Sequence, residues 1–400
     1  MKRLDVDNVT STFEPMPDDS WTGVLESPPG AEVQIDGKPY LYFAGTAYFA
    51  LQGHPAVIQA GCDAFRRYGV HSATSRGGYG TSPSLLEVEQ LAADYFQADA
   101  AFYFLSGYWG NNIIVGGLAG HYDVIFYDEH SHYSIMESIQ LARCPAYPFV
   151  HRNPDDLALK FREHLKGGQR PLVLTDGIFA SSGRIAPVDR YLELLQGIPN
   201  SLLVLDDAHA VGVLGDGRGT YAEFGISSTQ INRHPTEPAA DTARLYCCGT
   251  LSKAIGGSGG IVAGSAAWIS HLKSTSRYFN AASSPSAPIA AATAAALGLV
   301  MTDPSIRQRQ QNNARHLRTG LRKLGLEIED TSVPFTGLII KDASHMQMLQ
   351  RELRKRGIII AYAKVYSGVA SAGQLRIAVS SAHTESMIDR LLREFASLLG

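Results

Sequence analysis

The stretch Cys248–Gly257, CGTLSKAIGG, places Lys253 in a turn of small residues that follows a short apolar run. Upstream, the stretch Leu205–Gly212, LDDAHAVG, ends an apolar strand in Asp206, and His209 follows three residues later. Either motif alone is weak, because small-residue turns around lysines are common. Their order, an acid and then a lysine, each after a strand-like run, is much more specific.

An acid and a lysine in these settings are the two groups that a pyridoxal phosphate (PLP) enzyme needs. The amine of Lys253 can form a Schiff base with the aldehyde of the cofactor. An acid at a buried strand end, here Asp206, keeps the pyridine nitrogen protonated, so that the ring accepts electrons. The sequence therefore predicts PLP as the cofactor.

Size and composition restrict the class of protein. A length of 400 residues predicts two or three structural units, and the net charge of −3 indicates no nucleic-acid or anionic-membrane partner. No stretch approaches the roughly 20 apolar residues of a membrane helix, and the N-terminus lacks an apolar signal core. The four cysteines have no metal-like spacing, and adjacent Cys247 and Cys248 are expected in a strand. We expect a cytoplasmic protein without a bound metal.

Residues 55–290 alternate between strand-like and helix-like segments. Helices are expected at 55–68 and 84–96, and strands at 100–105, 123–127, 171–175, 202–205 and 243–247. Short apolar runs joined by amphipathic helices predict an α/β domain whose mostly parallel sheet is covered on both faces.

The two ends of the chain differ from this large domain. Residues 1–54 are expected to form an N-terminal arm with strand-like pieces at 33–40 and 41–44 and a hairpin turn at Asp36-Gly37. Residues 291–400 contain a polar helix around 304–324, strands near 337–340, 357–361 and 375–380, and a final helix at 385–399. They predict a smaller C-terminal α+β domain that packs on the first.

Two further stretches follow strand-like runs, and ligands of open α/β sheets gather beyond the carboxyl ends of the strands. Ser106–Asn111 begins an apolar helix whose exposed N–H groups suit a phosphate, although an ordinary strand-to-helix turn has the same pattern. Asp128–Ser134 carries two histidines and two acids, but nothing else in the chain completes a metal site. We therefore favour His132 as an aromatic face stacked on the cofactor ring.

In combination, these motifs resemble those of the α-oxoamine synthases, PLP enzymes of fold type I, from about Leu41 to the C-terminus. The matching motifs lie at Ser75–Thr81, Ser106–Asn111, Asp128–Ser134, Phe149–Asn153, Asp176–Gly183, Asp206–Gly212 and Gly249–Gly257. Near the end, Leu375–Thr384 is similar to the segment whose arginine, here Arg376, holds the amino-acid carboxylate. The resemblance implies fold type I, with a large domain at 55–290 and a small domain at 291–400.

The resemblance also implies a role for each matching residue. Asp206 would pair with the pyridine nitrogen, His209 would hydrogen-bond the 3-oxygen of the ring, and Lys253 would hold the aldehyde; with His132, these are the implied catalytic residues. The other implied cofactor-binding residues are Ser106, Gly107, Tyr108, Thr250 and Asn280. The implied substrate-binding residues are Arg376, whose planar guanidinium suits a carboxylate, Tyr48 and Ser75.

The implied reaction condenses an amino acid with an acyl thioester, carried by coenzyme A or an acyl carrier protein, to an α-amino ketone, usually with decarboxylation. The family is homodimeric with shared sites, and Asn280 stands in the segment that would reach the phosphate of the partner subunit. The chain departs from the family around Tyr48 and at Ser367–Ala370, which replaces Pro-x-Val-Pro. These departures fall where substrate contacts are expected, so the substrate pair stays open.

Two alternatives remain. Another PLP reaction, chiefly transamination or retro-aldol cleavage, would use the same cofactor. Typical class I aminotransferases have a tyrosine at the position of His209 and a phosphate-binding arginine at that of Ile261, and both are absent from this sequence. A binding protein on an inactive PLP fold is disfavoured by the joint presence of Asp206, His209 and Lys253.

Overall fold

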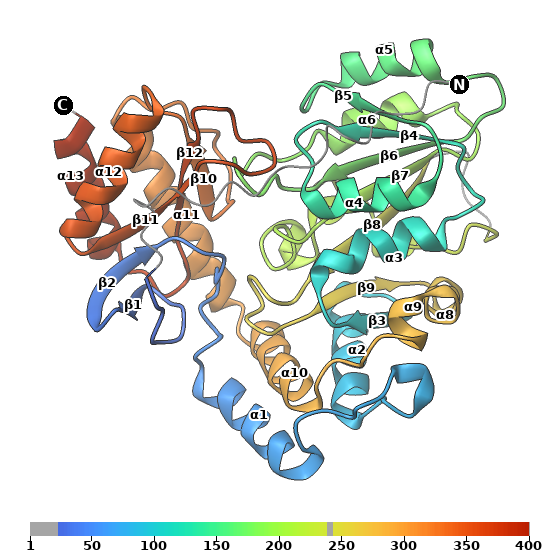
Figure 1. Cartoon of the computed structure of the whole chain (residues 1–400), viewed down its shortest axis with the longest axis horizontal. Helices are drawn as coiled ribbons and strands as arrows, with labels where there is room; N and C mark the ends of the chain where they lie inside the picture. Colours follow the sequence, from blue (N-terminus) through green and yellow to red (C-terminus); the bar gives the residue numbers. More distant parts are fainter. Residues whose placement is uncertain (1–22, 238–242, 400) are drawn as a thin grey trace.

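The computed structural model describes residues 23–237 and 243–399, which form two domains around two sheets (Figure 1). The sheet of the large domain has the strand order β3-β9-β8-β7-β6-β4-β5. Its strands are β3 (Ala100–Phe104), β4 (Val124–Asp128), β5 (Ala146–Phe149), β6 (Pro171–Asp176), β7 (Leu202–Asp206), β8 (Arg244–Thr250) and β9 (Gly260–Gly264). Only β9 runs antiparallel to its neighbours. The predicted α/β domain with a mostly parallel sheet is confirmed.

Apolar side chains on both faces of this sheet are buried, because helices cover both faces. One face packs on α3 (Gly110–Gly117), α4 (Tyr133–Ala142) and α8 (Ala266–Thr275). The other packs on α2 (Pro83–Phe96), α5 (Pro154–His164), α6 (Val188–Leu195) and α10 (Ala287–Thr302). Cys247 and Cys248 of β8 face opposite sides, as expected of neighbours in a strand.

The strands predicted for the large domain are all present, with ends displaced by at most three residues. Two short strands, β5 and β9, were not predicted. The segment of β5, AYPF, contains a proline, and that of β9, GIVAG, is bounded by glycines, so both lack a clear strand pattern. The predicted helices at 55–68 and 84–96 are α1 (Pro55–Tyr68) and α2.

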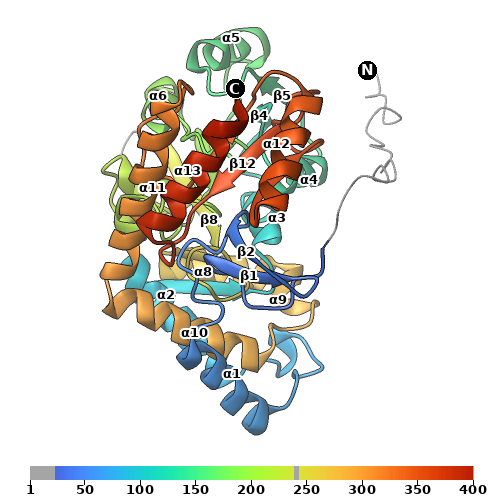
Figure 2. The ribbon, with the colours of Figure 1, turned by 90° about the vertical axis from the view of Figure 1, so that its left-hand side faces the viewer.

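The small domain is built on a second sheet of order β1-β2-β11-β12-β10. Its strands are β1 (Glu32–Ile35), β2 (Lys38–Phe43), β10 (Phe335–Leu338), β11 (Ile358–Ala363) and β12 (Gln374–Ala378). Three helices, α11 (Ser305–Lys323), α12 (Ala343–Lys355) and α13 (Glu385–Leu399), pack against it, and α13 lies between the other two (Figure 2). The predicted α+β character of this domain is confirmed.

The segment predicted as a separate arm is part of the small domain where it is described. The hairpin turn at Asp36-Gly37 is present, with positive φ at both residues, but β2 begins at Lys38 rather than after residue 40. Strand β2 then pairs in parallel with β11, far away in the sequence. The boundary predicted between residues 290 and 291 falls inside α10, which packs on α1 and α2 in the large domain.

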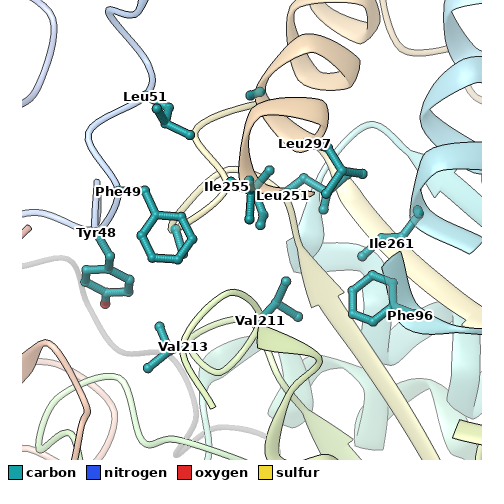
Figure 3. Close-up of a cluster of buried hydrophobic side chains, with 14 of the residues drawn as sticks. Tyr48, Phe49, Leu51, Phe96, Val211, Val213, Leu251, Ile255, Ile261 and Leu297 are labelled. Atoms are coloured by element: carbon teal, nitrogen blue, oxygen red, sulfur yellow. The ribbon is translucent and has the colours of Figure 1, made fainter. Parts of the chain in front are cut away.

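The chain after β2 returns to the large domain. There Tyr48, Phe49 and Leu51 enter a buried cluster with residues that follow β7 and β8 (Figure 3), including Val211, Val213, Leu251 and Ile255. This apolar cluster supports the turn that carries Lys253 from behind. Among the described residues, no single helix is long and apolar enough to cross a membrane. The pair α10–α11 has that length and composition when the two helices are taken together, but it is bent by 78° at the break between them.

Candidate active site

A cavity of about 470 Å³ lies between the two domains. It includes residues at the carboxyl ends of β6, β7 and β8 and residues of β11 and β12. Its lining is Thr46, Ser106, Gly107, Tyr108, His132, Ser134, Asp176, Ala180, Ser181, Asp206, Ala208, His209, Thr250, Ser252, Lys253, Ala361, Tyr362, Ala363, Tyr366, Gln374 and Arg376. Every site residue expected from the sequence is among these except Tyr48, Ser75 and Asn280.

Asp206 ends the fully buried run of β7 and points its carboxylate into the cavity. One oxygen, Oδ2, accepts hydrogen bonds from Asn111 Nδ2 at 2.7 Å and from Ser134 Oγ at 3.2 Å. The other, Oδ1, accepts from the backbone N–H of Ala208 at 3.0 Å. These donors fix the orientation of the carboxylate. The sequence motifs contained Asn111 and Ser134, but no role had been predicted for them.

Asp176 brings a second carboxyl group to the cavity, which had not been predicted as a site residue. It ends β6, in register with Asp206 on β7, and its Oδ2 accepts from the backbone N–H of His132 at 2.9 Å. Burial, together with the charge of Asp206, raises the pKa of Asp176 well above its usual range. The signal was present in the sequence, because LVLTD ends in an acid as LLVLD does.

Lys253 lies in the turn after β8 and projects into the same cavity. Burial lowers the pKa of its amine to about 8, although the charges of Asp206 and Asp176 act in the opposite direction. About a tenth of the amine is therefore unprotonated at pH 7, and this is the form that attacks an aldehyde.

A cradle for an anion lies beside the lysine. Ser106 Oγ accepts from the backbone N–H of Tyr108, where the chain turns from β3 into the helical segment that leads to α3. Gly107 packs so closely that a Cβ on it would lie 2.7 Å from Cβ of Thr250. Backbone N–H groups at a helix start suit a phosphate, and only glycine keeps this approach open.

Three side chains form a hydrogen-bonded chain behind the cavity. Arg376 Nη2 donates to Tyr48 Oη at 2.9 Å, and Tyr48 Oη lies 2.8 Å from Nδ1 of His209. Burial raises the pKa of Tyr48 to about 12 and lowers that of His209 well below its usual range, so both are neutral. The buried phenol proton needs an acceptor, and of its two neighbours Arg376 can only donate, so we assign that proton to Nδ1 and the proton of His209 to Nε2.

The guanidinium of Arg376 is held in place before any substrate arrives. Its Nε donates to the carbonyl of Ala180 at 3.2 Å, and its Nη1 donates to the carbonyl of Gly45 at 2.8 Å. The ring of Phe335 lies 4.2 Å from the guanidinium carbon. Among the described residues these contacts and the Tyr48 bond leave one N–H on each terminal nitrogen. Two such groups match the two oxygens of a carboxylate.

Tyr48 does not line the cavity, because the phenol is buried behind Arg376 and His209 with 1% of the residue exposed. The phenol contacts Arg376 and His209 instead of reaching the cavity, where the predicted contact with substrate would be made. Ser75 and Asn280 lie elsewhere, near each other: Ser75 bridges Ser283, and the amide of Asn280 donates to backbone carbonyls, including those of Lys273 and Ser274.

The residues present fit PLP. The cavity offers an anion cradle, an amine with a lowered pKa, a carboxylate oriented by three donors, and a histidine that presents Nε2–H. Each would suit one group of that cofactor: phosphate, aldehyde, pyridine nitrogen and 3-oxygen. Within residues 23–237 and 243–399, no cluster of three or more His, Cys, Asp or Glu side chains could hold a metal ion.

Comparisons with known proteins agree with this chemistry. Residues 43–395 match the family model described as aminotransferase class I and II. The 8-amino-7-oxononanoate synthase of Nitrosococcus oceani is 31% identical, over 94% of this chain and 96% of that protein. The enzyme of the same name from Methylococcus capsulatus is 32% identical, over 94% and 93%. Among solved structures, serine palmitoyltransferase from S. paucimobilis, with a bound PLP–myriocin aldimine, is 25% identical with a TM-score of 0.84, over 94% and 92%.

Proposed function

Because the chain belongs to the class I and II aminotransferase family, and within it to the α-oxoamine synthases, we propose that it joins an α-amino acid to an acyl thioester and releases an α-amino ketone. The predicted family, PLP fold type I and PLP cofactor are confirmed. The observation that carries the function is the meeting of Asp206, Lys253 and Arg376 in one cavity.

When bound, PLP supplies an electron sink for the negative charge that develops at the α-carbon of the amino acid. The chain supplies the rest. Asp206 would pair with the pyridine nitrogen and keep it protonated, and His209 would donate from Nε2 to the 3-oxygen. Lys253 would hold the aldehyde and would then accept the α-proton, a role that suits an amine whose pKa is about 8.

The two free N–H groups of Arg376 hold the carboxylate of the amino acid. This contact orients the α-carbon, because the guanidinium is itself fixed by Gly45, Ala180 and Tyr48. The small domain lines the cavity with Ala361, Tyr362, Ala363, Tyr366, Gln374 and Arg376. The two alanines leave space beside Arg376 for the second substrate, whose thioester is carried by coenzyme A or an acyl carrier protein.

A product screen tests the reaction. The purified holoenzyme is incubated with single amino acids and with acyl thioesters on coenzyme A or a carrier protein, and products are identified by mass spectrometry. We expect a new mass only when both substrates are present, equal to the condensed ketone with or without loss of carbon dioxide. Conversion of the amino acid to its oxo acid without thioester would instead establish transamination.

The active unit is a homodimer that shares its sites. Support comes from Ser75 and Asn280, which lie away from the cavity of their own chain, and from Val70 and Tyr79, which are exposed by 69% and 101%. For its amide to reach the phosphate of the partner subunit, Asn280 would exchange a bond to the carbonyl of Lys273 or Ser274 for one to that phosphate. The four cysteines are unpaired, in keeping with a cytoplasmic location.

Light scattering of the purified protein should therefore give twice the chain mass of 43.2 kDa. Mixing Lys253→Ala and Asn280→Ala subunits after gentle dissociation should restore activity, because one site of the mixed dimer has both residues intact. A fully active monomer would refute this assembly, and an Asn280→Ala variant with parent-like cofactor affinity would refute the role of that amide.

A further inference from the structure

A tyrosine from the small domain contacts His132 of the large domain. Tyr366 lies in the segment between β11 and β12, and its Oη is 3.0 Å from Nε2 of His132. Both residues line the cavity. The rings of Tyr133 and Tyr366 also meet edge to face, with centroids 5.7 Å apart.

Both ring nitrogens of His132 have hydrogen-bond partners. Nδ1 lies 3.2 Å from the backbone nitrogen of Ser134 and 2.8 Å from Ser134 Oγ. Burial lowers the pKa of this histidine, which is therefore neutral. The phenol of Tyr366 can donate to Nε2 or accept from it, so the bond at 3.0 Å forms with either tautomer. The imidazole is thus held at both ends, by α4 on one side and by Tyr366 on the other.

The residues after Tyr366 seat the loop on the segment that precedes α4. Ser367 Oγ donates to the carbonyls of His130, at 3.1 Å, and of Ser131. Gly368 has a φ of +72°, and a Cβ on it would lie 2.9 Å from Cβ of His130. Only glycine permits this approach and this backbone conformation together. The contacts of Ser367 and Gly368 therefore fix the position of Tyr366 relative to His132.

We propose that Tyr366 is a positioning residue of the reaction: its hydroxyl fixes the plane of the His132 ring against the cofactor. The proposal rests on the proposed function, because it takes the cofactor ring to lie on His132. One face of an imidazole can stack on a pyridine ring only if rotation about its side-chain bonds is restricted, and the Tyr366 bond supplies that restriction at the outer edge. We assign this role to this chain and not to the family, because Ser367–Ala370 stands here in place of the family's Pro-x-Val-Pro.

Tyr366→Phe removes the hydrogen-bond partner of Nε2 and keeps the ring. In the cofactor-free protein, long-range ¹H–¹⁵N spectra should show a changed Nε2 signal of His132 in this variant and an unchanged one in Tyr133→Phe. With PLP bound, the variant should keep its stoichiometry and lose part of the circular dichroism of the cofactor band. Its kcat should fall about five- to tenfold, the loss of one hydrogen bond, with little change in the KM for the amino acid.

A double-mutant cycle separates positioning from a general structural role. In a His132→Phe background, adding Tyr366→Phe should change kcat by less than about twofold, because the first change already removes the group through which Tyr366 acts. Gly368→Ala, which displaces the loop, should reproduce the dichroism loss. Tyr133→Phe is the matched control: it removes a neighbouring hydroxyl outside the cavity lining and should leave both readings unchanged.

Two results would overturn the proposal: a Tyr366→Phe protein with the dichroism and the His132 Nε2 signal of the parent, or effects of the two substitutions that simply add. Failure of the parent protein to bind PLP would instead overturn the proposed function. The NMR comparison needs no cofactor, so it tests the Tyr366–His132 contact independently of that outcome.

Discussion

Replacing Arg376 tests the substrate end of the site most directly. Its guanidinium offers one N–H from each terminal nitrogen to a carboxylate, and its other hydrogen bonds go to Gly45, Ala180 and Tyr48. A hydrogen bond to a charged group contributes about 1.5–3 kcal/mol. Two such bonds, reduced by the part that water replaces after truncation, give a loss of about 2–4 kcal/mol for Arg376→Ala. Amino-acid affinity should therefore fall about 30- to 1000-fold.

The structure adds a second consequence of this substitution. Without Arg376, the phenol of Tyr48 loses the donor that directs its proton to His209. Arg376→Lys keeps a positive charge but cannot donate along the three fixed directions and also present two N–H groups to a ligand. We expect the lysine variant to bind amino acid at least about tenfold more weakly than the parent, a difference of about 1.4 kcal/mol.

The assay is a titration of each holoenzyme with candidate amino acids, followed in the visible absorption of the cofactor. PLP content should match the parent, because the cofactor cradle at Gly107 and Thr250 lies elsewhere. Arg170→Ala is the control: this arginine pairs with Asp123 outside the cavity, and its loss should not change amino-acid affinity. If Arg376→Ala binds amino acid as tightly as the parent, the assigned carboxylate anchor is wrong.

Three further changes have defined outcomes. PLP uptake by the cofactor-free protein should become faster as pH rises through about 8, where the Lys253 amine loses its proton, while Lys253→Ala should yield no borohydride-stable adduct at any pH. Gly107→Ala should weaken PLP binding at least about tenfold, or about 1.4 kcal/mol, because the new Cβ would lie 2.7 Å from Cβ of Thr250; an unchanged dissociation constant in equilibrium dialysis would contradict this. Burial raises the pKa of Asp207 to about 7 from 3.8, so its neutral form stabilises the fold fully below about pH 4, and that contribution declines as pH rises through about 7. Asp207→Asn should therefore show a smaller fall in unfolding temperature between pH 4 and pH 8 than the parent, measured by calorimetry, and parallel curves would refute the assignment.

Several features of the site could be predicted because they are encoded by local patterns. Asp206 and Lys253 each follow an apolar strand, and the carboxyl ends of neighbouring strands meet at one edge of a sheet. Asp176 has the same signal but was not given a role, because a single strand-end acid does not reveal which strand lies next to it. The register of β6 on β7 supplies that information.

Contacts between distant segments could not be predicted from the sequence. The N-terminal strands belong to the small domain because β2 pairs in parallel with β11, and a short strand does not specify a partner that far along the chain. The burial of Tyr48 between Arg376 and His209 needs both domains to be in place.

The sequence by itself determined the chemistry of this protein: a lysine, an acid and a glycine-lined turn at strand ends, because periodicity and turn residues act over a few positions and place such groups at one edge of the sheet. Only the tertiary structure decided how those groups are held. The Tyr48 chain behind the cavity and the Tyr366 contact to His132 both join residues from separate domains. Their geometry follows from packing of the small domain on the large one, a long-range property that no local pattern in the chain encodes.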